Sequence, residues 1–134
     1  MHVQPYLFLD GRCDEAIEFY RTAIGAEVTF LMRFKENPDP AGCPPGAEDK
    51  VMHAVLQIGG TTIFASDGRC QGHPNFAGFS LSLTVAEDQQ AQRLFAALSE
   101  GGQVHLPLTK TFFSSCFGML ADRFGVGWMI MVLA

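Results

Sequence analysis

The same order of expected elements occurs twice along this chain, and that repeat limits the possible folds more than any other feature of the sequence. Residues 3–10 form a short apolar run, and residues 13–25 follow with the apolar spacing of a helix. The second half restarts with a strand-like run over 79–85 and a helical pattern over 86–102. Three more strands are expected after each helix, so each half has the order of a βαβββ module. These strands cover 26–34, 50–58 and 61–67 in the first half and 103–113, 115–122 and 127–134 in the second.

One module on its own leaves one face of a four-stranded sheet without a helix. We therefore expect an α+β fold in which two tandem modules, about 1–70 and about 78–134, form a single domain of residues 1–134. Side by side, the modules would form a curved mixed sheet with the helices on its convex face. The concave face would then enclose a cleft suited to a small molecule.

The alternation of side chains along a strand assigns the expected faces of the sheet. Ser80 and Ser82 alternate with apolar residues, so the serines are expected to face the cleft. His53 and Gln57 share one face of their strand and form the more polar set there. These four side chains are therefore candidates for ligand binding.

The last expected strand lacks this alternation, because every residue from Trp128 to the end is apolar. We expect Trp128 and its same-face neighbours to pack beneath the helix, and Met129 and Met131 to line the cleft. Phe113 would add an aromatic side chain to the cleft wall. Methionine and aromatic residues at this spacing are also typical of an ordinary core, so both interpretations stay open.

Composition and charge exclude several classes of partner. The formal net charge is -5 and the nine Lys and Arg residues are scattered, so neither nucleic acid nor a membrane surface is expected. No apolar run approaches the roughly 20 residues of a membrane helix, and the first residues lack the pattern of a signal peptide. The expected location is the cytoplasm.

Reactive motifs are scarce. The four cysteines show no CxxC pair, so reduced thiols are expected, although Cys13 begins a helix whose dipole could favour a reactive thiolate. The sequence contains no GxSxG elbow, no P-loop and no GxGxxG after the first strand. A catalytic residue is therefore not identified by motif.

The chain resembles the PhnB-like group of the vicinal-oxygen-chelate superfamily, which includes glyoxalase I, extradiol dioxygenases, fosfomycin-resistance proteins and bleomycin-binding proteins. The resemblance covers nearly the whole chain apart from residues 35–50. It is carried by "PYLFLDGRCDEAIEFYRTAIGAEV", "KVMHAVLQIGG", "ASDG", "FSLSLTV", "LFAALSEGGQVHLPLTKTFF" and "FGMLADRFGVGWMI".

Metal-dependent members of the superfamily hold a divalent ion with side chains from the first and fourth strands of each module. The resemblance implies that these positions are Pro5, Ser80, Met129 and either Phe64 or Ala65. Such side chains are poor donors for a divalent metal. We predict no metal and no other cofactor, and a divalent metal held after a one-residue shift of the alignment is the alternative.

PhnB-like sequences are often grouped under a demethylubiquinone methyltransferase heading. S-adenosylmethionine usually binds a doubly wound sheet with a glycine-rich loop, which a duplicated βαβββ chain does not provide. A methyltransferase that depends on S-adenosylmethionine is therefore not expected.

His53 is the best candidate for a catalytic residue, because histidine can exchange a proton near neutral pH. It could equally be a structural side chain bonded to its neighbours. Asp67, which precedes Gly68, could bind a ligand or could be an ordinary turn residue. The expected ligand-binding residues are His53, Gln57, Asp67, Ser80, Ser82, Phe113, Met129 and Met131.

Three functions fit these features. The preferred one is a protein that binds a small apolar or aromatic molecule in its cleft, with or without turnover. The alternatives are a metal-dependent lyase or oxidoreductase of the glyoxalase or dioxygenase type, and a structural or regulatory homodimer with a filled cleft. The resemblance implies a homodimer, which would also cover exposed strand edges.

Overall fold

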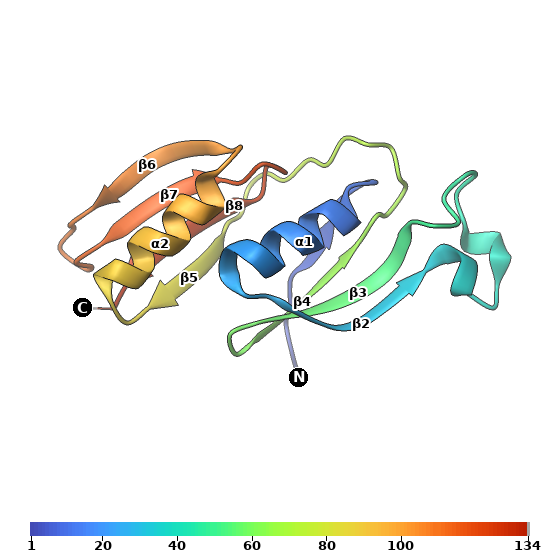
Figure 1. Ribbon diagram of the computed structural model, residues 1–134, viewed down its shortest axis with the longest axis horizontal. Helices are drawn as coiled ribbons and strands as arrows, with labels where there is room; N and C mark the ends of the chain where they lie inside the picture. Colours follow the sequence, from blue (N-terminus) through green and yellow to red (C-terminus); the bar gives the residue numbers. More distant parts are fainter. Residues whose placement is uncertain (134) are drawn as a thin grey trace. The chain divides into compact units, whose positions relative to one another are not determined.

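The computed structural model describes residues 1–133 (Figure 1). The chain divides into two compact units, Met1–Pro74 and Asn75–Ala134. Unit 1 contains β1 (Tyr6–Phe8), α1 (Cys13–Ile24), β2 (Glu27–Arg33), two 3₁₀ helices (Phe34–Glu36 and Pro40–Gly42), β3 (Val51–Ile58) and β4 (Thr61–Ser66). Unit 2 contains β5 (Leu81–Val85), α2 (Asp88–Ser99), β6 (Gln103–Thr109), β7 (Phe117–Ala121) and β8 (Gly127–Val132).

The sheet of unit 1 has the strand order β1-β4-β3-β2. Strand β1 runs parallel to β4, and the other neighbouring pairs are antiparallel. Helix α1 ends where Gly25 adopts a left-handed φ of 70°, which a residue without Cβ reaches at no steric cost. The apolar spacing of α1 forms its buried side, which consists of Cys13, Ala16, Ile17, Tyr20 and Ala23.

Unit 2 repeats this topology with the strand order β5-β8-β7-β6, and β5 runs parallel to β8. Helix α2 buries Ala91, Leu94, Phe95 and Leu98. The helix and the sheet approach each other closely at Gly118 of β7. A Cβ added there would lie 2.7 Å from Cε2 of Phe95, so this strand position accommodates only glycine without a shift.

Each sheet therefore has a helix face, which its own helix covers, and an opposite face that we call the open face. Strand β8 shows both, because Trp128, Ile130 and Val132 are buried whereas Met129 and Met131 are half-buried. The predicted alternation of this strand is thus observed. The same alternation in β3 leaves His53, Val55 and Gln57 half-buried on the open face of unit 1.

The outer strands β2 and β6 are both irregular. In β2 the pairing with β3 shifts between Val28 and Phe30, so that Phe30 rather than Thr29 lies opposite Val55. In β6 the pairing with β7 shifts twice between Val104 and Thr109. The shift in β2 matters for the site, because it decides which side chains of this strand reach the open face.

The predicted α+β class and the two βαβββ modules are confirmed. The hydrogen-bonded strands form two four-stranded sheets, one in each unit. Several strands are shorter than expected, because β1 begins only at Tyr6 and β5 only at Leu81. Ala134, the last residue of the expected final strand, lies outside the described residues.

Candidate ligand-binding site

A row of large side chains crosses all four strands on the open face of unit 1. Tyr6 of β1 lies opposite Phe64 of β4, and Phe64 lies opposite Val55 of β3. Val55 in turn lies opposite Phe30 of β2. Since opposite residues in neighbouring strands share a face, backbone register alone brings these side chains together.

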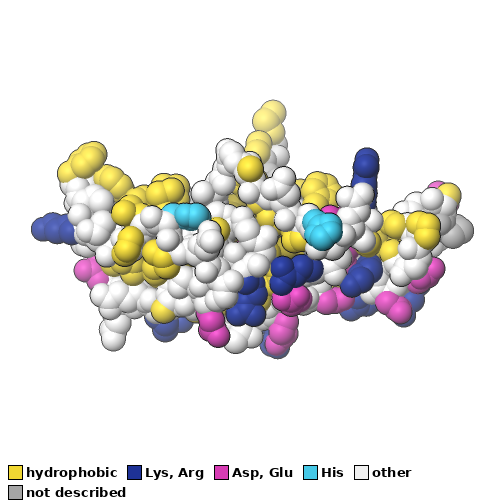
Figure 2. Space-filling model, turned by 90° about the horizontal axis from the view of Figure 1, so that it is seen from above, with side chains coloured by type: hydrophobic (Ala, Val, Ile, Leu, Met, Phe, Trp, Pro, Cys, Tyr) yellow, Lys and Arg dark blue, Asp and Glu magenta, His cyan; other side chains and the backbone are white. Residues whose placement is uncertain are grey.

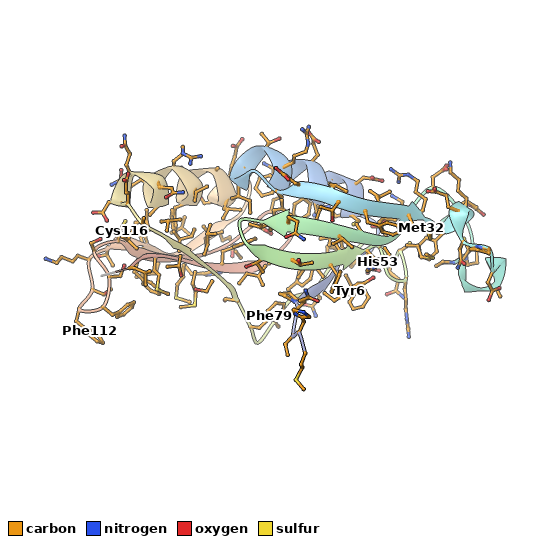
Figure 3. The ribbon with its side chains drawn as sticks, turned by 90° about the horizontal axis from the view of Figure 1, so that it is seen from below. Tyr6, Met32, His53, Phe79, Phe112 and Cys116 are labelled. Carbon is orange, nitrogen blue, oxygen red and sulfur yellow. The ribbon has the colours of Figure 1, made fainter. Side chains whose placement is uncertain are left out.

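His53 lies beside this row and contacts three of its rings. The His53 ring centroid is 5.5 Å from Phe64, 5.6 Å from Tyr6 and 6.1 Å from Phe30. The Tyr6 hydroxyl and His53 Nδ1 are 2.9 Å apart, which is a hydrogen bond. Figure 3 shows Tyr6 and His53 on the side of the sheet away from α1, pointing toward each other.

Three rings of this face are well exposed to solvent. The exposed fraction is 38% for Tyr6, 57% for Phe8 and 45% for Phe30, and Phe8 lies 4.9 Å from Tyr6 between ring centroids. In the unit 1 part of Figure 2, charged side chains gather mainly over the α1 side instead. We call this surface the aromatic face, and it consists of Tyr6, Phe8, Phe30, Met32, His53, Val55 and Phe64. A contiguous exposed apolar surface of this kind is a candidate binding surface.

Gln57 lies further along β3 on the same face as His53. Its Nε2 donates a hydrogen bond to Oγ1 of Thr62, its cross-strand partner, at 2.7 Å. The structure thus puts two of the predicted site residues, His53 and Gln57, on one surface. It also adds Tyr6, Phe8 and Phe30, which the sequence reasoning missed; the alternation of Tyr6 and Phe8 around buried Leu7 was the available signal.

Asp67 lies apart from the aromatic face and is fully buried. Its Oδ1 accepts hydrogen bonds from the backbone N–H groups of Gly11 and Cys13, at 3.0 and 2.8 Å. Its Oδ2 accepts one from the N–H of Val51 at 2.7 Å. The carboxylate holds the start of α1 and the start of β3, so we leave Asp67 out of the candidate site.

The open face of unit 2 carries methionines together with the buried ring of Phe117, which lies opposite Met131. Ser82 lies opposite Met129, and Met129 lies opposite Met119 of β7. Met131 lies two residues further along β8, opposite Thr84. We call this surface the methionine face. Ser82, Met129 and Met131 were expected to share a face, and Met119 is a member that the sequence reasoning missed.

Ser80 and Phe113 lie outside the strands of unit 2. Ser80 precedes β5, and its Oγ would lie 2.8 Å from a Cβ added to Gly127. The ring of Phe113 contacts the rings of Phe112 and Phe117, with 5.1 Å between centroids in each case. Ser80 therefore lies just before β5, and Phe113 contacts Phe117, which lies opposite Met131 on the open face of unit 2.

The positions that would hold a metal carry unsuitable side chains. Among these positions, Pro5 precedes β1, and its neighbour Tyr6 is the residue of β1 that pairs with Phe64. The corresponding pair in unit 2 is Ser82 with Met129. Two aromatic rings, a hydroxyl and a thioether do not fit a divalent ion. Within residues 1–133, no group of three or more His, Cys, Asp or Glu side chains could hold a metal ion.

The cysteines contribute no reactive group to the aromatic face. All four are free, and Cys13 is fully buried at the start of α1. Burial, followed by the neighbouring Asp67 carboxylate, raises the pKa of the Cys13 thiol. This result overturns the possibility that the helix start makes Cys13 a reactive thiolate.

The family model described as 3-demethylubiquinone-9 3-methyltransferase matches residues 1–131. The chain belongs to this family. The family's description names a methyltransferase, whereas the sheets of this PhnB-like chain are not doubly wound parallel sheets. The assignment therefore rests on the sequence match and agrees with the predicted PhnB-like relationship.

Several relatives cover almost the whole PhnB-like chain. Protein YjdN of Escherichia coli is 33% identical over 99% of this chain and 96% of its own length. The crystal structure of protein PA1353 from Pseudomonas aeruginosa is 38% identical, with a TM-score of 0.87 over 99% of this chain and 98% of that one. The PhnB protein from Bacillus cereus, titled a putative 3-demethylubiquinone-9 3-methyltransferase, is 27% identical, with a TM-score of 0.82 over 98% and 99%.

The wider fold is that of the vicinal-oxygen-chelate superfamily. The fosfomycin resistance protein FosX from Listeria monocytogenes has a TM-score of 0.67 at 8% identity, over 100% of this chain and 93% of that one. At this identity the likeness shows the fold alone.

Within residues 1–133, α1 and α2 both fall short of the length and hydropathy that a membrane-crossing helix needs.

Proposed function

We propose that this protein binds a small, planar, largely apolar or aromatic molecule against the aromatic face of unit 1. The observation that carries the proposal is His53, a polar side chain that lies within 6.1 Å of three aromatic rings on an exposed sheet face. Ligand sites commonly combine apolar and aromatic walls with a few placed polar groups.

The physical basis is the removal of ring surface from water. Tyr6, Phe8 and Phe30 keep between 38% and 57% of their surface exposed, and a flat ligand would cover part of it. Aromatic pairs in offset or edge contact contribute about 0.5–1.5 kcal/mol beyond the area that they bury. Because the rings already contact one another, ordering them costs little when a ligand binds.

Naphthalene, an uncharged planar molecule, provides a direct test. We expect a measurable dissociation constant by calorimetric titration, and an affinity about tenfold lower for Phe30→Ser, since roughly 1–2 kcal/mol of ring contact would be lost. Phe112→Ser is the matched control, because Phe112 is 98% exposed and lies in unit 2. Its affinity should equal that of the wild type.

Two outcomes would contradict the proposal. One is the absence of binding at the solubility limit of naphthalene. The other is equal affinity of the wild type and Phe30→Ser, which would mean that binding occurs elsewhere in the protein.

The donor set does not favour a metal-dependent lyase or oxidoreductase, and no observation supports methyl transfer. The positions that the resemblance implies for a metal are Pro5, Ser80, Met129 and either Phe64 or Ala65, and they offer few oxygen or nitrogen donors. Metal content after purification without chelators tests the alternative. Stoichiometric metal whose removal lowers the melting temperature would replace the proposed function by a metal-dependent one.

We also propose that the protein is a cytoplasmic homodimer. The methionine face, together with the edge strands of the sheets, supplies surfaces that a second copy can cover while the aromatic face stays free for a ligand. Sedimentation at micromolar concentration tests this, and a monomer there would contradict it. A dimer in which Phe30 becomes protected and naphthalene does not bind would favour the structural homodimer instead.

A further inference from the structure

The hydrogen bond between Tyr6 and His53 determines which atom of the histidine faces a ligand. The two atoms involved are the Tyr6 hydroxyl oxygen and His53 Nδ1, 2.9 Å apart. A phenol is a better donor than acceptor, and the unprotonated nitrogen of a neutral imidazole is a good acceptor. The O–H of Tyr6 therefore donates to Nδ1, and the imidazole proton resides on Nε2.

His53 Nε2 is available to a ligand. Within residues 1–133, the hydrogen bond from Tyr6 is the one polar contact of the His53 ring, and it engages Nδ1. No buried side-chain nitrogen or oxygen among these residues lacks a partner. Because Nε2 has no partner, it must contact solvent, and its N–H is a donor that points away from Tyr6.

None of the seven residues that make up the aromatic face carries a formal charge. The aromatic face contains no Lys, Arg, Asp or Glu, and Arg33 at the end of β2 is already paired with Asp14 at 2.9 Å. Glu27 lies at the other end of β2, opposite Gln57. A charged ligand would give up hydration here without gaining an opposite charge, so the face suits a neutral molecule.

We infer that the aromatic face recognises a neutral planar aromatic molecule that carries one hydrogen-bond acceptor, such as a ring nitrogen or a carbonyl, and that His53 Nε2–H donates to this acceptor. Tyr6 is the positioning residue that holds the imidazole in the required tautomer and orientation. This inference rests on the proposed function and narrows it from apolar aromatic ligands in general to one chemical class.

The tautomer can be measured without any ligand. In ¹⁵N-labelled protein, long-range ¹H–¹⁵N correlations within the imidazole ring distinguish the protonated nitrogen from the unprotonated one. The signals that belong to His53 are those that disappear in His53→Phe. We expect Nε2 to be protonated in the wild type. In Tyr6→Phe, which keeps the ring and removes the hydroxyl, the two nitrogens should move toward averaged shifts.

Ligand recognition is tested with the isosteric pair quinoline and naphthalene, which differ by one ring nitrogen. Without a hydrogen bond the more apolar naphthalene should bind at least as tightly. If His53 donates a hydrogen bond to the ring nitrogen, we expect the wild type to bind quinoline about fivefold more tightly than naphthalene. One hydrogen bond contributes a difference of this size in a site of this kind. His53→Phe should abolish the preference and Tyr6→Phe should reduce it, whereas Phe112→Ser should keep it.

The outcomes separate the two proposals. If both molecules bind, and Phe30→Ser weakens both, but quinoline has no advantage, the proposed function stands and the inference about Nε2 is wrong. An unprotonated His53 Nε2 in the wild type would also overturn the inference. If neither molecule binds, the proposed function fails and the inference fails with it.

Discussion

The two units share a backbone plan but differ in the side chains of their open faces. In unit 1 the face consists of rings that contact one another around His53. In unit 2 the corresponding strands carry Met119, Met129 and Met131 beside serine, threonine and the buried ring of Phe117. Rings with few torsions give a shape that is fixed before binding, whereas methionines adapt to what they contact. The open face of unit 1 is therefore the more rigid of the two surfaces, and that of unit 2 is the more adaptable.

The units also differ in how they satisfy buried backbone groups at the ends of their central strands. Unit 1 uses the Asp67 carboxylate, which accepts three backbone hydrogen bonds. Unit 2 uses the Ser114 hydroxyl, which bonds Cys116 and Val132 at distances of 2.8–3.2 Å. A charged acceptor makes stronger hydrogen bonds than a hydroxyl. Asp67 should therefore contribute more to stability than Ser114, although unit 2 also has a buried carboxylate, Asp122, which accepts three hydrogen bonds.

The largest expected effect tests these anchors directly. Asp67→Ala should lower the free energy of unfolding by about 3 kcal/mol or more, because it leaves buried N–H groups of Cys13 and Val51 without an acceptor. Ser114→Ala should cost about 1–2 kcal/mol, since a neutral hydroxyl is lost. Urea unfolding measures both, and equal costs would show that the two anchors are energetically alike.

The next effect concerns the contact between helix and sheet. Gly118→Ala should lower the free energy of unfolding by about 1–3 kcal/mol, because the new Cβ would lie 2.7 Å from Phe95. Gly60→Ala is the control, since a Cβ there meets nothing within 4 Å. The corresponding strand of unit 1, β3, contains no glycine, so this constraint is particular to unit 2. If Gly118→Ala left the free energy of unfolding unchanged, α2 would be able to move away from β7 at little cost.

The smallest expected effect is a dependence of the free energy of unfolding on pH, and it comes from the buried Cys13 thiol of unit 1. Burial and Asp67 raise the pKa of Cys13 above its ordinary value of 9.0. Above that value the unfolded chain loses the proton while the folded chain keeps it, so stability falls as the pH rises. The slope approaches about 1.4 kcal/mol per pH unit for one such group. Cys13→Ala should have a flatter profile than the wild type and Cys43→Ala, as urea unfolding at successive pH values would show.

Much of the fold follows from local pattern. The helix starts and stops, the repeated order of elements and the alternation along β8 were predicted, because each depends on neighbouring residues alone. The open-face positions of His53 and Gln57 were predicted for the same reason. Within one regular strand the side chains alternate strictly between the two faces of the sheet, so the sequence assigns each residue to the correct face.

The aromatic face was missed because it depends on pairing between strands that are far apart in the chain. Phe30 reaches it only through the irregular pairing of β2, which a strict period of two does not include. Tyr6 was overlooked because the sequence reasoning considered only Pro5 in the first strand, whereas Tyr6 is the residue that pairs with Phe64. Asp67 precedes Gly68 and is therefore typical of a turn in the sequence. Only the tertiary structure shows that its carboxylate is buried.

The irregular pairing in β2 and β6 has a consequence for how the protein behaves in solution. Each of these strands lies at the outer edge of its sheet, with Val28 and Phe30 or Val104 and Leu106 exposed. A straight apolar edge of this kind is a template on which further chains add and aggregate. A bulged edge offers a broken row of donors and acceptors, and Pro107 removes one donor from β6. The irregular pairing therefore makes β2 and β6 poorer templates for the addition of further strands.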